Sequence, residues 1–247
     1  MTSPVAASGS VIGWAAVTLL LSYLAGSIPF AYIIVKGVTG EDVTAHGTGN
    51  VGSMNVRRTT GSWAWFAAAV VGDGLKGLIP VALAKVASAL PVLVPYGVSI
   101  QTLSAQSGGP TGPAAMLLYP LPPIAVLGVV LGHNYSFWMA LIERKFTRTG
   151  KGLATGAGAL LAYDWRYFVV AIVVALAVIA VTRYMMAGQV AAAVALPVTA
   201  LVLNSPDWPF MVLMGGLVYA AHHKRFVGML RGKEPKLYIN DRMGPRG

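Results

Sequence analysis

Cysteine is absent from this sequence, and acidic residues are scarce, with 8 Asp and Glu against 18 Lys and Arg. The absence of cysteine excludes disulfide bonds and thiolate metal sites. Only 11% of the 247 residues are charged and 56% are hydrophobic, whereas soluble globular proteins have roughly 25% charged residues. This balance predicts an integral membrane protein. The net charge of +10 is therefore expected at a membrane surface, not on nucleic acid.

The chain contains several long hydrophobic runs, most of which are close in length to the roughly 20 residues that a helix needs to cross a bilayer. The predicted fold is an all-α integral membrane protein with about seven transmembrane helices in a single polytopic domain, residues 1–247. The N-terminus lacks a positive segment, so the first run is interpreted as a retained span and not a signal peptide. The predicted spans are 10–35, 62–86, 114–142, 152–163 (short and glycine-rich), 165–184, 187–204 and 208–222, with an uncharged Pro/Gly/Ser-rich insert at 87–113 and a basic tail at 223–247.

The basic residues predict the orientation of these spans. Under seven alternating spans, fifteen of the eighteen Lys and Arg residues fall on one side. The positive-inside rule then places the N-terminus outside and the C-terminus in the cytoplasm. The polar segments 46–58, 143–152 and 222–236 would consequently share the cytoplasmic face.

Two of these segments combine glycines with basic residues. Glycine-rich backbone exposes N–H groups that can surround an anion, and a following helix N-terminus adds its dipole. The second segment is not a Walker A motif, because it has Leu153 where Ser or Thr would bind magnesium. Either loop alone is equally consistent with a simple glycine turn, but two together favour an oxyanion site. The first loop offers Gly47, Gly49 and Gly52, the donors Thr48, Asn50 and Asn55, and the cations Arg57 and Arg58; the second offers Gly150, Lys151 and Gly152 before Thr155.

Two charged residues and the four histidines are further candidates for functional or structural roles. Asp73 and Lys76 are three residues apart in the second span, hence on one helix face, and are interpreted as a structural intramembrane pair. His133 lies toward the end of the third span, where it could be an acid, a ligand or an interface residue. A helix-end histidine that bonds the backbone is the commoner case. In no case do exactly four residues separate a His from a following Asp, which removes the His-x4-Asp arrangement of one large acyltransferase class. Scattered histidines without a carboxylate cluster predict no metal site.

In motif order and spacing, the sequence resembles the bacterial acyl-phosphate:glycerol-3-phosphate acyltransferases, small seven-span enzymes of phospholipid synthesis. The resemblance covers this chain from about residue 20 to residue 236. The motifs that carry it are GSIP at 26–29, GTGNVGSMNVRR at 47–58, DGLKG at 73–77, GHNYSF at 132–137 with TGKGLAT at 149–155, and HHKRFVGMLRGKE at 222–234.

The resemblance implies transfer of a fatty acyl group from acyl phosphate to the 1-hydroxyl of glycerol 3-phosphate, giving lysophosphatidic acid. It implies no metal or organic cofactor, no general base from the enzyme, and an active site on the cytoplasmic side of the bacterial inner membrane, among anionic lipids. With the loop chemistry, it predicts catalytic roles for Thr48, Asn50, Arg58, Lys151 and His222, and substrate contacts for Gly47, Gly49, Gly52, Asn55, Gly150, Gly152, Thr155, His133 and Arg225.

The sequence also departs from the family pattern. Thr48 replaces Ser, Met54 replaces Thr and Thr149 replaces Gly; in the third motif Arg225 stands where the family has Asn and Gly228 where it has Arg. An extra basic segment, 143–148, separates His133 from Lys151. Its cations, Arg144, Lys145 and Arg148, are predicted to form a lipid-facing electrostatic patch outside catalysis.

Two other functions fit the sequence less well. A transporter or channel for an organic phosphate would also use glycines and intramembrane charges, but no inverted repeat is visible. An inactive lipid-binding relative is the second alternative, which the altered third motif leaves open.

Overall fold

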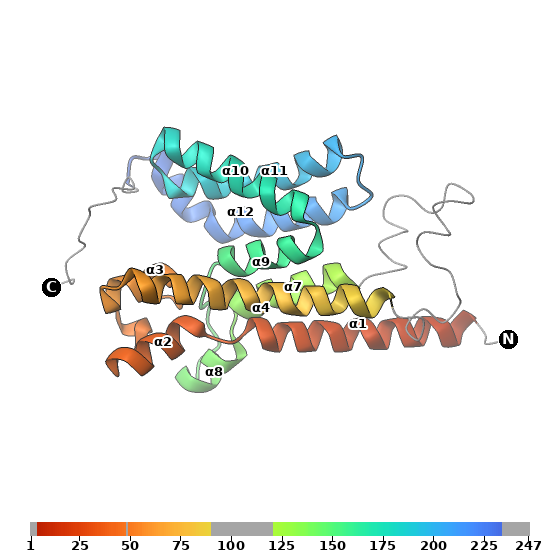
Figure 1. Cartoon of the computed structure of the whole chain (residues 1–247), viewed down its shortest axis with the longest axis horizontal. Coiled ribbons are helices and arrows are strands. Elements are labelled where there is room, and N and C mark those ends of the chain that lie inside the picture. The colour runs from red at the N-terminus through yellow and green to blue at the C-terminus, as the bar shows by residue number, and fades with distance from the viewer. Residues whose placement is uncertain (1–3, 48, 90–120, 234–247) are drawn as a thin grey trace. The chain divides into compact units, whose positions relative to one another are not determined.

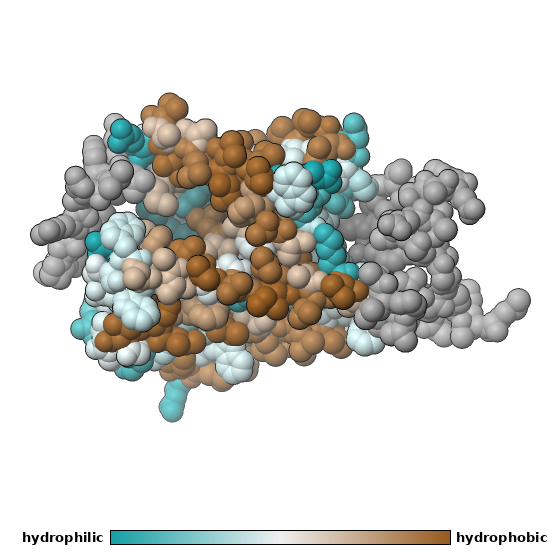
Figure 2. Space-filling view, in the orientation of Figure 1, coloured by the Kyte–Doolittle hydropathy of each residue, from teal (hydrophilic) through white to brown (hydrophobic). Residues whose placement is uncertain are grey.

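The computed structural model describes residues 4–47, 49–89 and 121–233, and every regular element in these ranges is a helix. Helices are expected in a bilayer because each backbone polar group must be bonded within its own segment. Apolar side chains spread over the outward surfaces of the helices, as Figure 2 shows for one face. The all-α membrane fold is thus confirmed. Five segments are long and apolar enough to cross a membrane: Ile12–Thr39, Trp63–Ser88, Leu121–Glu143, Trp165–Thr182 and Met185–Val202.

The contacts within the chain group it into two compact units (Figure 1). The N-terminal unit comprises Ala16–Ala82 and Ile124–Ala162, and the C-terminal unit includes Leu83–Pro123 and Tyr163–Ile239. The predicted insert at 87–113 lies outside the described residues from residue 90 onward. The helices are α1 (Pro4–Gly26), α2 (Phe30–Thr39), η1 (Val43–Ala45), α3 (Ser53–Thr60), α4 (Trp63–Ala89), α7 (Leu121–Asn134), α8 (Phe137–Glu143), α9 (Leu153–Tyr163), α10 (Trp165–Thr182), α11 (Met185–Val202) and α12 (Trp208–Leu230).

The first predicted span is not one continuous helix. Helix α1 ends at Gly26 and α2 begins at Phe30, after Pro29, whose ring lacks the N–H that a continuous helix needs. The Ser27 carbonyl in this break accepts a hydrogen bond from the Ser136 hydroxyl at 2.5 Å. Ser136 itself caps α8 and separates it from α7, so the third predicted span is broken as well. The two breaks are therefore tied to each other.

Glycines allow two pairs of helices in the N-terminal unit to cross with their backbones in contact. A Cβ on Gly132 of α7 would collide with the carbonyl of Tyr23 in α1. A Cβ on Gly158 of α9 would collide in the same way with the backbone of Gly74 in α4. Small residues of this kind let membrane helices approach closely enough for dispersion contacts to hold them together. The α4–α9 crossing places the helix after the second glycine loop directly on α4.

The C-terminal unit contains α10, α11 and α12, and α11 packs against both of its neighbours (Figure 1). Gly215 of α12 lies against the carbonyl of Ala193, which brings these two helices close. Helix α12 continues to Leu230, beyond the predicted end of the last span at residue 222. The first part of the predicted basic tail is therefore helical, and its residues occupy helix faces instead of a loop.

Candidate functional site

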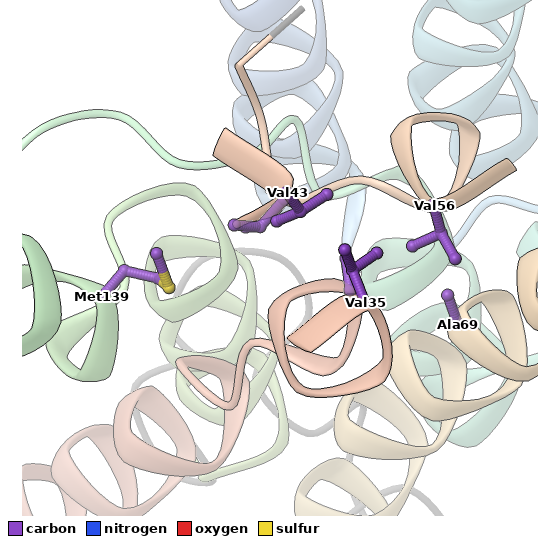
Figure 3. Close-up of a cluster of buried hydrophobic side chains, with 7 residues drawn as sticks. Val35, Val43, Val56, Ala69 and Met139 are labelled. Atoms are coloured by element: carbon purple, nitrogen blue, oxygen red, sulfur yellow. The ribbon is translucent and has the colours of Figure 1, made fainter. Parts of the chain in front are cut away.

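The first glycine loop rests on an apolar floor in the N-terminal unit. The loop follows α2, and Asp42 caps the short helix η1 by accepting hydrogen bonds from the Thr44 amide and hydroxyl, each at 2.8 Å. Figure 3 shows the buried side chains beneath it, which come from several helices and point toward one another. Burial of this cluster holds the loop against the helices. The cluster contains Ala31, Val35, Val43, Val51, Val56, Ala69 and Met139.

Asn55 shapes the first loop from within. Its side chain is fully buried, and its amide nitrogen donates to the carbonyls of Val43 at 2.7 Å, His46 at 2.9 Å and Asn50 at 3.1 Å. Gly47 has a φ of +55°, and a Cβ there would collide with the Asn55 side-chain oxygen. Glycine is consequently required at this position on both counts. The amide nitrogen of Asn55 serves the loop backbone, and its predicted substrate contact remains a prediction.

The two adjacent arginines have different surroundings. They lie on α3, a helix of their own before α4, and not in the loop where the sequence placed them. Consecutive helical residues point about 100° apart. The Arg57 guanidinium lies over the Trp63 ring, 4.9 Å from its centroid, which is a cation–π contact. The Arg58 side chain instead passes the loop, where its Cδ would be 3.2 Å from a Cβ on Gly47.

A direct hydrogen bond joins the two glycine loops. The Val51 amide of the first loop donates to the Thr149 carbonyl of the second at 2.9 Å. The Thr149 amide donates to Asn134 at 2.8 Å, and its hydroxyl donates to the His133 carbonyl at 2.9 Å. These bonds fasten both loops to the end of α7. In the sequence, Thr149 stands out only as a departure from the family pattern, and that departure was the available signal for its structural role.

The backbone on the N-terminal side of Lys151 is held closely. A Cβ on Gly150 would collide with the His133 ring, so only glycine lets the loop approach this side chain. The Nε of Arg148 donates to the Gly150 carbonyl at 3.1 Å. Arg148 is thus turned toward the loop, which separates it from the lipid-facing patch predicted for it. On the other side of Lys151, Gly152 has a φ of +77°, a left-handed conformation that glycine adopts without strain.

Beneath the second loop, buried polar side chains connect three helices. The Nδ1 of His133 lies 3.1 Å from the Thr155 hydroxyl and 3.7 Å from Asp73 Oδ1. Lys76 forms an ion pair with the same Asp73 oxygen at 2.8 Å, which is the geometry expected of the predicted pair. All four side chains are buried. Within this part of the chain, Thr155 and His133 support the loop from below, and their predicted substrate contacts remain predictions.

The third motif lies on α12 in the C-terminal unit. The His222 side chain is buried, and its Nδ1 lies 2.8 Å from the Val218 carbonyl one turn earlier. Arg225, one turn further along, is exposed. Thr48 lies outside the described residues. Among the residues that the structure describes, no group of three or more His, Asp or Glu side chains could hold a metal ion.

Comparison with known proteins shows the family that this chain resembles in sequence. A family model described as glycerol-3-phosphate acyltransferase matches residues 16–232. A protein of that name from Syntrophomonas wolfei is 32% identical over 227 residues, which cover 90% of this chain and 96% of the relative. Another, from Thermus thermophilus, is 34% identical over 224 residues, covering 89% of this chain and 94% of the relative.

The same fold occurs in a solved structure. The crystal structure of PlsY, an integral membrane glycerol 3-phosphate acyltransferase, in its glycerol 3-phosphate form matches this chain with a TM-score of 0.68 at 24% identity. The match covers 91% of this chain and 96% of that one. The lysophosphatidic acid form of PlsY matches with a TM-score of 0.66.

Proposed function

Because the chain belongs to the glycerol-3-phosphate acyltransferase family, we propose that it acylates the 1-hydroxyl of glycerol 3-phosphate, using acyl phosphate as the donor. The observation that carries this proposal is the hydrogen bond from Val51 to Thr149, because it brings two glycine-rich, basic loops together. Two such loops can surround a dianionic phosphate with backbone donors and with the cations Arg58 and Lys151. The product is lysophosphatidic acid.

The two cations have different tasks in this proposal. Burying a phosphate beside apolar helices is costly unless its charge is matched. Arg58 can bind two phosphate oxygens of glycerol 3-phosphate through its planar guanidinium, whereas Lys151 contributes a compact positive charge. Both would counter the charge that develops as the acyl group moves between the substrates. Arg57, which packs on Trp63, is not assigned to the phosphate.

The reaction balances without a base from the enzyme. The hydroxyl oxygen of glycerol 3-phosphate attacks the carbonyl carbon of acyl phosphate and forms the ester C–O bond. The bond from that carbon to the phosphate oxygen breaks, and the departing phosphate takes the hydroxyl proton. Neither a metal ion nor an organic cofactor takes part. His222 and the Thr48 hydroxyl are further catalytic residues in this proposal, and Arg225 is a further substrate contact. Asn50 and the loop glycines supply donors.

We place the reaction on the cytoplasmic side of the bacterial inner membrane. In this topology, α9 and α12 are spans in addition to the five long apolar segments, which gives seven spans. The N-terminus is then outside and the C-terminus is cytoplasmic, because the positive-inside rule puts most Lys and Arg residues on that side. Anionic lipids surround the basic face.

The decisive experiment supplies purified protein with an acyl phosphate and labelled glycerol 3-phosphate and resolves the lipid products. Labelled lysophosphatidic acid is the expected product. Acyl-CoA in place of acyl phosphate should give little or none, and a comparable rate with acyl-CoA would refute the proposed donor. Uptake of labelled glycerol 3-phosphate into proteoliposomes, without acylation, would identify a transporter instead. Neither product nor uptake would indicate an inactive lipid-binding relative.

A further inference from the structure

An apolar groove of about 520 Å³ lies on the N-terminal unit, and none of the glycines of the two loops lines it. Its volume is within the range of about 300–1,000 Å³ found for small-molecule sites. Aliphatic side chains of α1 line one part of the groove, and the aromatic rings of Tyr135 and Phe146 line another. The full lining is Ala16, Leu19, Leu20, Tyr23, Leu131, Tyr135 and Phe146.

The aromatic part of this groove is built by specific contacts. The Tyr135 and Phe146 rings stack with their centroids 5.9 Å apart. The Tyr23 hydroxyl donates to the Tyr135 carbonyl at 2.8 Å, which ties α1 to the end of α7. Phe146 is nevertheless 67% exposed, so much of its surface is open to a ligand. An exposed aromatic ring held in place by stacking is a surface on which an apolar ligand can pack.

The extra basic segment, residues 143–148, contains positive charges next to Phe146 in the sequence. Arg144 and Lys145 immediately precede Phe146 and are both exposed. Arg144 follows the last residue of α8 as its C-cap and has a φ of +53°, so the chain turns there. Arg148 of the segment is turned away to the Gly150 carbonyl. Arg144 and Lys145 are therefore the two exposed cations that directly precede Phe146, an aromatic residue of the groove, in the sequence.

We propose that this groove binds one acyl chain of an anionic membrane phospholipid whose headgroup is bound by Arg144 and Lys145. The aliphatic part of the groove would take the acyl chain, the aromatic rings would lie at the membrane interface, and the exposed cations would meet the phosphate of such a lipid. A zwitterionic lipid would fill the apolar part equally well, but its headgroup would gain less from the two cations. The proposal does not depend on the proposed acyl transfer, because it concerns lipid binding alone.

The charged and aromatic residues of the site come from one short segment of the chain. Both the cations and Phe146 lie in residues 143–148, the segment that separates His133 from Lys151 more widely than in the family pattern. Bulk lipid would cover any apolar membrane surface without choosing a headgroup. Selection between headgroups is therefore the property that distinguishes a built site from an ordinary lipid-facing surface.

The test uses the full-length protein, delipidated in a neutral detergent and titrated with phosphatidylglycerol or with phosphatidylcholine. Bound lipid per protein is counted by native mass spectrometry, and the midpoint of thermal unfolding, Tm, is followed in parallel because a ligand of the folded state raises it. We expect one phosphatidylglycerol to be retained at concentrations where phosphatidylcholine is lost. Glycerophosphoglycerol, the headgroup without its chains, should not raise the Tm at the same concentration.

Two variants separate the charged and apolar contributions. Arg144→Gln with Lys145→Gln should raise the apparent Kd for phosphatidylglycerol about tenfold or more, since each cation near an anionic surface contributes about a factor of five. Phe146→Ala should weaken the binding of both phosphatidylglycerol and phosphatidylcholine. The matched controls are Arg183→Gln with Lys233→Gln, which remove two exposed cations elsewhere, and Trp165→Ala, which removes an exposed aromatic ring of α10. Neither control should change the Kd.

Three results would overturn the proposal. Equal retention of the two lipids would show a surface that does not select headgroups. An unchanged Kd in the double charge variant would place the headgroup elsewhere. If Phe146→Ala raised the KM for acyl phosphate but left phosphatidylglycerol binding intact, the groove would hold the substrate chain and not a membrane lipid.

Discussion

Lys76 Nζ lies 2.8 Å from Asp73 Oδ1, one turn earlier on α4, and each side chain is only 3% exposed. The same ammonium donates at 2.7 Å to the carbonyl of Ile28, in the break between α1 and α2. A buried charge that loses its partner is much more costly than the intact pair. This relationship therefore links the intramembrane charges of α4 to the place where the first apolar run stops being helical.

Replacing Lys76 by Met should destabilise the protein strongly. The change leaves the Asp73 carboxylate buried without its cation, which typically costs about 3–5 kcal/mol. Asp73→Asn combined with Lys76→Met removes both charges and should recover much of the loss. The measurement is the Tm in detergent, with Lys85→Met at the exposed end of the same helix as the control. A double variant as unstable as Lys76→Met alone would argue against the pair.

Gly158→Ala should disrupt the crossing of α4 and α9. The added methyl group would collide with the backbone of Gly74, and overpacking of this kind typically costs about 1–3 kcal/mol. Gly156→Ala on the same helix meets nothing within 4 Å. It should be neutral or slightly stabilising, because alanine favours helices more than glycine does. Tm values that fall equally for both variants would mean that helix contact at Gly158 is not the cause.

Arg58→Ala and Lys151→Ala should each impair the use of glycerol 3-phosphate severely, and Arg57→Ala much less. Loss of a charge-assisted contact with phosphate should cost roughly 1.5–3 kcal/mol, or about 10- to 150-fold in kcat/KM. Arg58→Lys should rescue only partly, because the planar fork is lost. The measurement is steady-state kinetics with glycerol 3-phosphate varied at saturating acyl phosphate.

Arg57 supplies the internal control for that series. Its guanidinium packs on Trp63, so Arg57→Ala should lower the Tm more than it lowers kcat/KM. Near-normal efficiency in both Arg58→Ala and Lys151→Ala would place the phosphate elsewhere.

Thr149→Val should weaken both stability and activity, and Thr149→Ser should preserve them. The hydroxyl bonds to the His133 carbonyl, and its loss leaves that buried acceptor without this donor, at a cost of about 1–3 kcal/mol. Valine has a similar shape, so packing changes little. The Tm and the kcat/KM for glycerol 3-phosphate report the two effects. A Val variant that matches wild type in both would show that the hydroxyl does not hold the second loop.

Much of the fold follows from the amino-acid sequence. The apolar runs at 165–184 and 187–204 predicted two spans that the structure contains as α10 and α11. Such predictions succeed because a segment that crosses a bilayer needs apolar side chains and a backbone whose polar groups are hydrogen-bonded within the segment. The grouping of Gly, Arg and Lys residues in two loops predicted an anion site for a similarly local reason, since exposed N–H groups and cations follow from residue type.

The tertiary structure decided which of these residues meet. The hydrophobic run is continuous from residue 10 to 35, so it did not predict the break at residues 27–29 or the bond from this break to Ser136. The contacts of Asn55 and Arg148 could not be predicted either, because their partners are carbonyl oxygens whose positions depend on the path of the loops. The joining of the two loops through Val51 and Thr149 is likewise a backbone contact. Every residue but proline carries the same amide and every residue the same carbonyl, so only the packing of the helices determines which pair forms the bond.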